Sequence, residues 1–294
     1  MQQPSLSWLT DLDKFAVNRI KAYSDHKYYD TMDAARRQDD MTYRHSLNGS
    51  WQFSYANNPQ SRVKDFHKPD YDTTGWDIIQ VPGHIQLQGY GKPHYVNKMY
   101  PWDGHEDLTP PNIPVEHNPV GSYVKTITIP DRFEEKPLFI SFQGVETAFY
   151  LWMNGEFVGY SEDSFTPADF DLTPFIKSGE NKLAVEVYLR STGSWLEDQD
   201  FWRFSGIFRD VYLYSKPELH VDDLKVVADL DDTYTNGQLH VQLKLNDVME
   251  GSRVAFLLED TNGKQLITEQ SDLTKQHHDL TFDVMEPNLW SAEN

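Results

Sequence analysis

The pattern of hydrophobic and polar residues along the chain predicts many short strands separated by turns. Apolar, aromatic and β-branched residues fill runs at 138–142, 183–189 and 211–214. A further run at 149–160 surrounds Asn154-Gly155, a dipeptide that suits the type I′ turn of a tight hairpin. Helical patterns are scarce. We therefore expect residues 47–216 to form an all-β unit, a jelly-roll-type sandwich of two packed sheets.

A second β unit is expected after Lys216-Pro217, which marks a domain boundary. Strand-like runs follow at 223–230, 238–245, 253–259 and 280–285, with Asn262-Gly263 as another hairpin turn. This pattern indicates an immunoglobulin-like sandwich. Such a sandwich usually takes about 100 residues, whereas residues 217–294 number only 78. We expect its last strand or two to be missing, so that the domain is truncated and the chain is a fragment.

Composition narrows the possible partners and compartments. With 46 acidic and 26 basic residues, the net charge of −20 disfavours nucleic acid and anionic membranes as partners. The absence of cysteine excludes disulfides and thiol chemistry. No signal peptide or long apolar run is evident, which indicates a cytoplasmic protein. Residues 1–46 are polar, and we expect them to form an arm that wraps over the sandwich or contacts another subunit.

One short stretch, residues 194–210, combines four acids, two tryptophans and two arginines. Carboxylates accept hydrogen bonds from sugar hydroxyls, and flat rings cover the apolar face of a pyranose. The stretch could therefore be a sugar site. It could equally be a buried ion-pair corner, in which Arg203 or Arg209 neutralises Asp198 or Asp200. The residues alone leave both interpretations open.

Several motifs follow one another along the chain: Asn97-Lys98-Met99-Tyr100-Pro101, Trp152-Met153-Asn154-Gly155, residues 193–200 and Ser205-Gly206-Ile207-Phe208-Arg209-Asp210. In sequence and in order, they resemble the glycoside hydrolase family 2 β-galactosidases. The match begins near Leu47 and runs to the end of the chain, and details at residues 81–84 and 164–167 are most similar to the large subunit of the heterodimeric lactobacillus-type enzyme.

The resemblance implies hydrolysis of terminal β-D-galactose residues, as in lactose, with retention. A retaining glycosidase needs two carboxyl groups about 5–5.5 Å apart. In the family both are glutamates of a TIM barrel that follows the second domain, so we expect the barrel to be absent from this chain and assign no catalytic residue. Glu197 and Asp200 do not replace them, because residues three apart on an extended segment point in opposite directions. The chain alone is predicted to be inactive.

The resemblance also implies which residues bind substrate. Asp200 matches an aspartate that contacts galactose hydroxyls and a sodium ion. The alternative role for Asp200 is a salt bridge to Arg203 or Arg209. Asn97 matches an asparagine of the galactose subsite, and its alternative is a turn-closing role. Glu197, Asp198 and Arg203 are expected to support the loop. Trp202 is also expected to support the loop. For both Trp195 and Trp202, packing in the core is favoured over stacking on a sugar.

Cofactors and partners follow from the same resemblance. Sodium is expected at Asp200, and magnesium in the full enzyme, with ligands in the barrel. Glu162, Asp163 and Asp169 form an acidic cluster, but Thr192 stands where an acidic magnesium ligand is expected, so we predict no metal there. The expected partners are the barrel, later domains and further subunits, as a homo-oligomer or a heterodimer with a small subunit. The alternative function is a non-catalytic galactose-binding or assembly module.

Overall fold

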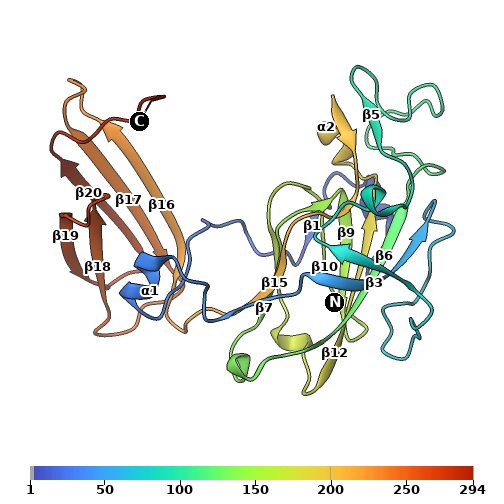
Figure 1. Cartoon of the computed structure of the whole chain (residues 1–294), viewed down its shortest axis with the longest axis horizontal. Helices are drawn as coiled ribbons and strands as arrows, with labels where there is room; N and C mark the ends of the chain where they lie inside the picture. The colour runs from blue at the N-terminus through green and yellow to red at the C-terminus, as the bar shows by residue number, and fades with distance from the viewer. Residues whose placement is uncertain (1–2, 199, 294) are drawn as a thin grey trace. The chain divides into compact units, whose positions relative to one another are not determined.

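The computed structural model describes residues 3–198 and 200–293, and the chain divides into two units (Figure 1). Gln199, which belongs to the 194–210 stretch, lies outside the described residues. The larger unit contains the residues up to Ala22 together with Asp40–Ser215, and the smaller one contains Tyr23–Asp39 and the residues from Lys216 onward. The N-terminal region is therefore shared between the two units.

Two antiparallel sheets form the larger unit, as the sequence predicts. The main sheet has the order β1 (Ala16–Val17), β10 (Glu156–Ser161), β9 (Ala148–Met153), β12 (Glu180–Tyr188), β6 (Val120–Thr128), β3 (Gly49–Ala56) and β4 (Asp77–Val81). The second sheet has the order β11 (Ala168–Asp171), β7 (Phe139–Phe142), β15 (Val211–Tyr214) and β2 (Arg44–Ser46). The runs at 138–142, 183–189 and 211–214 thus become β7, β12 and β15.

Short elements complete this unit. Two small ribbons pair β5 (His94–Val96) with β13 (Phe201–Arg203), and β8 (Val145–Glu146) with β14 (Gly206–Ile207). The helical elements are α2 (Ser194–Glu197) and the 3-10 turns at Leu6–Thr10, Gln86–Gln88, Asp131–Phe133 and Thr173–Phe175. The described residues contain no alternating strand–helix units of the kind that build a TIM barrel.

The predicted hairpin at residues 149–160 is confirmed. Strands β9 and β10 pair from Phe149↔Ser161 to Met153↔Glu156. Asn154 and Gly155 both have positive φ, 53° and 89°, as a type I′ turn requires. The Asn154 side chain donates a hydrogen bond to Asn181 Oδ1 at 2.8 Å, which ties the turn to the start of β12.

Strand β9 separates two hydrophobic layers, because successive side chains on a strand point to opposite faces. Phe149, Leu151 and Met153 belong to the core between the two sheets. Tyr150 and Trp152 belong to a second cluster on the outer face of the main sheet, where Trp8 of the N-terminal segment packs against Tyr150. The N-terminal segment therefore covers an apolar sheet face that would otherwise meet water.

Gly159 in β10 is a sensitive position in this packing. A Cβ atom added there would overlap the Phe170 ring and lie 2.7 Å from the Val17 carbonyl oxygen. We expect Gly159→Ala to lower the free energy of unfolding by about 1–3 kcal/mol, the usual cost of overpacking. Gly75→Ala is the matched control, because a Cβ at Gly75 meets nothing within 4 Å. Urea unfolding measures both, and equal stabilities for the two variants would contradict the expectation.

From Lys216 onward, the smaller unit is also built from β-strands. One sheet has the order β16 (Val221–Leu230), β17 (Gly237–Leu245) and β20 (His277–Val284), and a second sheet pairs β18 (Arg253–Glu259) with β19 (Gln265–Asp272). These five strands compare with seven in a constant-type immunoglobulin domain. A loop from Asp260 to Lys264 contains the predicted Asn262-Gly263 turn, and Leu243, Leu245 and Leu273 form the core.

The segment Tyr23–Asp39 packs with the smaller unit. The Asp223 carboxylate accepts a hydrogen bond from the Ser24 backbone N–H at 2.9 Å, and the Tyr28 hydroxyl donates to the Val221 carbonyl at 2.7 Å. Helix α1 (Met32–Arg37) begins after Thr31, whose side chain accepts a hydrogen bond from the Ala34 N–H. This part of the polar N-terminal region therefore contacts the strands of the immunoglobulin-like unit.

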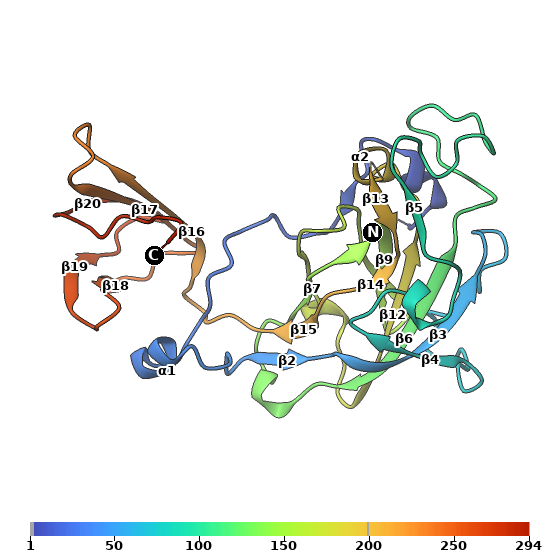
Figure 2. The same cartoon turned by 45° about the horizontal axis from the view of Figure 1, so that its top comes forward.

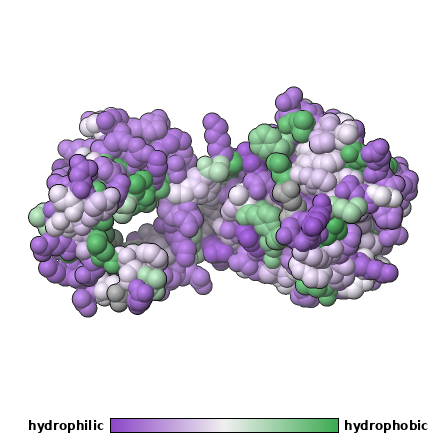
Figure 3. Space-filling view, turned by 90° about the horizontal axis from the view of Figure 1, so that it is seen from above, coloured by the Kyte–Doolittle hydropathy of each residue, from purple (hydrophilic) through white to green (hydrophobic). Residues whose placement is uncertain are grey.

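Hydrophilic side chains cover most of the visible surface of both units, and hydrophobic ones gather in small patches (Figure 3). This distribution agrees with the net charge of −20. Among residues 3–198 and 200–293, none of the helices has the length and apolar composition that a membrane crossing requires.

Candidate functional site

The β5–β13 ribbon carries the two residues predicted to bind sugar. Figures 1 and 2 both place β5 beside α2, and Figure 2 labels β13 between them. In the ribbon Phe201 pairs with Val96, Trp202 with Tyr95 and Arg203 with His94. Asn97 follows β5 and Asp200 precedes β13. The antiparallel register therefore brings these two exposed residues together at one end of the ribbon.

Tyr95 connects Asn97 to Asp200. Its hydroxyl donates a 2.5 Å hydrogen bond to Asp200 Oδ1. This bond raises the pKa of Tyr95, while the Asn97 side-chain amide, which donates to the same hydroxyl oxygen, lowers it. Asp200 has a φ of 45°, a left-handed conformation that aspartate tolerates better than most residues. The three side chains form one exposed, hydrogen-bonded group that offers both donors and acceptors.

Aromatic rings adjoin this group. The Trp202 side chain is 50% exposed, and its ring lies 5.5 Å from that of Tyr95. The prediction that Trp202 packs in the core is therefore wrong. Trp202 pairs with Tyr95 and lies with it on the exposed face of the ribbon. Trp195 differs, since it packs against Tyr100 and Trp102 and donates a hydrogen bond to the Asn112 carbonyl.

Glu197 does not lie on an extended segment, contrary to the sequence expectation. Residues 194–197 form helix α2, which follows Gly193. The Glu197 carboxylate accepts hydrogen bonds from the Ser164 N–H and hydroxyl, at 2.8 and 2.6 Å. Burial raises the pKa of Glu197 above its usual value, and the hydrogen bonds from Ser164 offset only part of this rise. Glu197 therefore holds the 162–164 turn, while Asp200 bonds to Tyr95.

Asp198 is the residue that forms the ion-pair corner. It is 5% exposed and accepts a hydrogen bond from Arg190 Nη1, and its Oδ1 lies 3.4 Å from Arg203 Nε. Arg203 also donates to the Asp198 carbonyl and to the Phe201 carbonyl. One carboxylate thus serves two buried guanidinium groups. The two interpretations of the 194–210 stretch therefore apply to different residues. Asp198 is buried and paired, as in an ion-pair corner, whereas Asp200 is exposed, as a sugar site requires.

Glu146 lies next to this corner and was not singled out from the sequence. It is 6% exposed in β8, and burial raises its pKa to about 8, with further contributions from Asp198 and Glu197. Its Oε2 lies 3.9 Å from His84 Nδ1. Burial lowers the pKa of His84, so this contact joins two neutral groups near pH 7. His84 is stacked between Phe204 and Phe208.

The acidic residues near the Glu162 turn are not brought together as metal ligands. Glu162 accepts hydrogen bonds from Ser191, Thr192 and Gly193 at 2.7–2.9 Å. Asp163 is exposed and bonds to Thr166, and Asp169 accepts from the Tyr214 hydroxyl. Within the described part of the chain, no group of three histidine or acidic side chains is arranged to hold a metal ion.

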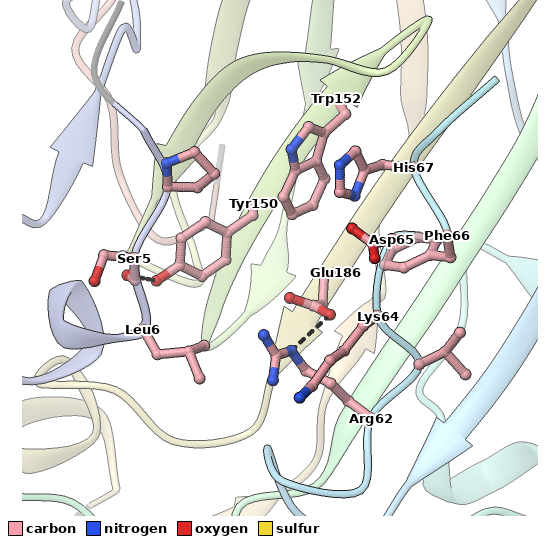
Figure 4. Close-up of a pocket in the computed structure, with 12 residues that line it drawn as sticks. Ser5, Leu6, Arg62, Lys64, Asp65, Phe66, His67, Tyr150, Trp152 and Glu186 are labelled. Atoms are coloured by element: carbon pink, nitrogen blue, oxygen red, sulfur yellow. Dashed lines mark hydrogen bonds and ion pairs between the residues drawn. The ribbon is translucent and has the colours of Figure 1, made fainter. Parts of the chain in front are cut away.

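A separate hollow of about 240 Å³ lies between the N-terminal segment and the outer face of the main sheet (Figure 4). Arg62 and Glu186 form an ion pair at its base, at 3.2 Å, and the Tyr150 hydroxyl donates to the Ser5 carbonyl. The His67 ring is stacked on Trp152. None of the predicted site residues lines this hollow.

Three kinds of comparison place the chain among known proteins. Residues 44–217 match the model described as "Glycosyl hydrolases family 2, sugar binding domain", and residues 219–294 match "Glycosyl hydrolases family 2". The Bifidobacterium dentium β-glucuronidase is similar in fold, with a TM-score of 0.65 and 17% identity over 86% of this chain and 44% of that one.

Curated relatives match almost the whole chain. The β-galactosidase of Halalkalibacterium halodurans is 58% identical over 99% of this chain, and the β-galactosidase large subunit of Leuconostoc lactis is 42% identical over 99%. The chain spans 29% and 48% of these relatives' own lengths. Because the sugar-binding-domain model alone matches more than half of its residues, the chain belongs to glycosyl hydrolases family 2.

Proposed function

We propose that this chain supplies galactose contacts to the active site of a retaining β-galactosidase. The observation that carries the proposal is the group formed by Asn97, Tyr95 and Asp200 at the open end of the β5–β13 ribbon. The names of the relatives support galactose as the sugar. In this role the chain completes a site whose reacting groups lie elsewhere in the enzyme.

The exposed group has the chemistry that a sugar needs. The Asp200 carboxylate accepts hydrogen bonds from hydroxyls, and the Asn97 amide both donates and accepts. The half-exposed Trp202 ring offers a flat apolar surface beside them. The Tyr95 hydroxyl fixes the carboxylate in place, so less side-chain freedom is lost when a sugar binds.

The proposal assigns no catalytic carboxylate to the chain. A retaining mechanism requires an acid/base and a nucleophile about 5–5.5 Å apart. Glu197 is bonded to Ser164, and Asp198 is buried between Arg190 and Arg203. We therefore propose that both catalytic glutamates belong to a barrel outside this chain, together with any magnesium ligands.

The donor set fits sodium. Asp200, Tyr95 and Asn97 present carboxylate, phenol and amide oxygens, and hard cations prefer such oxygen ligands. Asp200 would hold the ion with oxygens of this group, and a bound sodium ion would position sugar hydroxyls by direct contact. The exposed carboxylate remains accessible to both.

We also propose that the chain works together with further domains or subunits. Relatives from Leuconostoc lactis and Latilactobacillus sakei are named as large subunits of β-galactosidase. The Halalkalibacterium halodurans relative has no such designation in its name and is about three times longer than the region matched here. A small subunit, or later domains of one chain, would supply the remaining parts.

A hybrid enzyme tests the proposal. In it, this chain replaces the matched region of the Halalkalibacterium halodurans β-galactosidase, to which it is 58% identical. Asp200→Asn should lower kcat/KM for lactose by about 10- to 100-fold, because hydrogen bonds to a charged group contribute about 1.5–3 kcal/mol. The same variant should weaken the dependence of the rate on sodium.

Asp107→Asn is the matched control, since Asp107 is exposed on the loop that follows β5. Unchanged kinetics and sodium response in Asp200→Asn would overturn the proposed role. The chain by itself should not cleave a nitrophenyl β-galactoside, and turnover that persists through purification would contradict the assignment of the catalytic groups. Galactose binding by the chain, combined with an inactive hybrid, would favour the binding-module alternative.

A further inference from the structure

The β5–β13 ribbon has a second face, which lines a pocket of about 670 Å³. Side chains on a strand alternate between faces, and directly paired residues share a face. Tyr95 and its partner Trp202 therefore occupy the face described above, while His94 and its partner Arg203 occupy the other. His94 and Arg203 both line the pocket, and Tyr95, Asn97, Trp202 and Asp200 do not. The pocket is thus distinct from the proposed galactose contacts.

Basic side chains dominate the pocket, although the chain has a net charge of −20. One carboxylate, that of Glu116, is found among its lining residues. Its basic lining residues are Lys92, His94, His105, His117, Arg190 and Arg203. Asp198 pairs with both arginines, so three positive charges (Arg190, Arg203 and Lys92) stand against two negative ones (Asp198 and Glu116), and the histidine rings add N–H donors. A local excess of donors and positive charge on an acidic protein favours a negatively charged ligand.

An unsatisfied donor at the same place points to a ligand independently of charge. Trp102 lines the pocket and is 2% exposed, and within residues 3–198 and 200–293 its indole N–H has no hydrogen-bond partner. Buried indole N–H groups usually find an acceptor. Arg190 lies over the Trp102 ring, 5.8 Å from its centroid. The Arg190 guanidinium group thus lies beside the ring that carries the unpaired N–H.

We propose that this pocket binds a small molecule that carries a tetrahedral oxyanion, of the phosphate or sulfate class. Such an anion has several acceptor oxygens and suits arginine, lysine and an N–H donor together. Apart from Asn57, the rest of the lining is largely apolar and consists of Tyr55, Pro93, Pro101, Pro114, Pro119 and Leu189. It leaves room for a ring or short chain attached to the anion. This inference does not depend on the proposed galactosidase function.

The test uses the whole chain labelled with nitrogen-15 and titrated with inorganic phosphate at constant ionic strength. The resonance of the Trp102 indole N–H, assigned by its loss in Trp102→Phe, is expected to shift and saturate. Lys92→Gln combined with His105→Asn should raise the Kd by about tenfold, since it removes one full charge and one ring donor. Both residues are exposed, so the fold is retained, and an unchanged spectrum elsewhere checks this.

Lys98→Gln is the matched control, because Lys98 is exposed beyond the end of β5 and does not line the pocket. Its Kd should equal that of the unmodified chain. Parallel titrations with sulfate and with glucose 6-phosphate distinguish a simple oxyanion from a phosphorylated small molecule, which should bind more tightly. An indole resonance that does not move with any of the three anions, or an equal effect of Lys98→Gln, would overturn the proposal.

Discussion

Replacing Glu146 with glutamine should remove a large part of the loss of stability between about pH 5 and pH 8. The folded pKa of Glu146 is about 8, against 4.5 for the free side chain. A raised folded pKa means that the contribution of this group is fully present below about pH 4.5 and is lost as the pH rises through 8. At 1.36 kcal/mol per unit over the 3.5 units between these two pKa values, the loss is about 5 kcal/mol and is complete by pH 9.

The neutral amide of Glu146→Gln resembles the protonated carboxyl group and cannot ionise. Urea unfolding followed by tryptophan fluorescence from pH 5 to pH 9 measures the effect, and seven of the eight tryptophans lie in the larger unit. The difference between variant and unmodified chain should grow with pH, which separates Glu146 from other titrating groups. Glu156→Gln, at an exposed position, is the control. A pH-independent difference would show that Glu146 is ionised in the folded protein.

Asp198→Asn should destabilise the larger unit more than any exposed change in the same loop. The variant keeps the shape of the side chain but leaves the guanidinium groups of Arg190 and Arg203 buried without their shared counter-charge. Removing one partner of a buried ion pair costs about 3–5 kcal/mol. The midpoint of urea unfolding should fall accordingly.

The same substitution two residues later provides the comparison. Asp200 is exposed, so Asp200→Asn should change the free energy of unfolding by no more than about 0.5 kcal/mol. The pair therefore separates stability from the proposed sugar contact, since Asp198→Asn should act on folding and Asp200→Asn on binding. Equal losses of stability in the two variants would contradict the assignment of Asp198 as the ion-pair residue.

Local sequence signals predicted much of the fold. Asn154-Gly155 specified its hairpin because two residues with positive φ are needed there and this dipeptide provides them. β19 was not recognised as a run, since Gln265–Asp272 is polar and largely exposed. Helix α2 was missed because four residues are too short to show helical periodicity.

The site was less accessible from sequence, because its contacts join distant segments. Asn97 and Asp200 were identified by resemblance, but the Tyr95 hydroxyl that links them depends on the register between β5 and β13. The sequence could not decide whether Asp198 or Asp200 meets Arg203, as that depends on which carboxylate is buried. Glu146 carries no local sign of its shifted pKa, which arises from the depth at which β8 is buried.

The division of the N-terminal region also bears on how the chain folds during synthesis. Tyr23–Asp39 belongs with strands that begin after Lys216, so the ribosome makes all of Asp40–Ser215 before this segment can meet its partners. At about 5–20 residues per second, the wait is roughly ten to thirty seconds. The jelly roll can thus be complete while a polar stretch that includes Arg36, Arg37 and Asp39 remains solvated, and the polar composition of this stretch suits exposure to water.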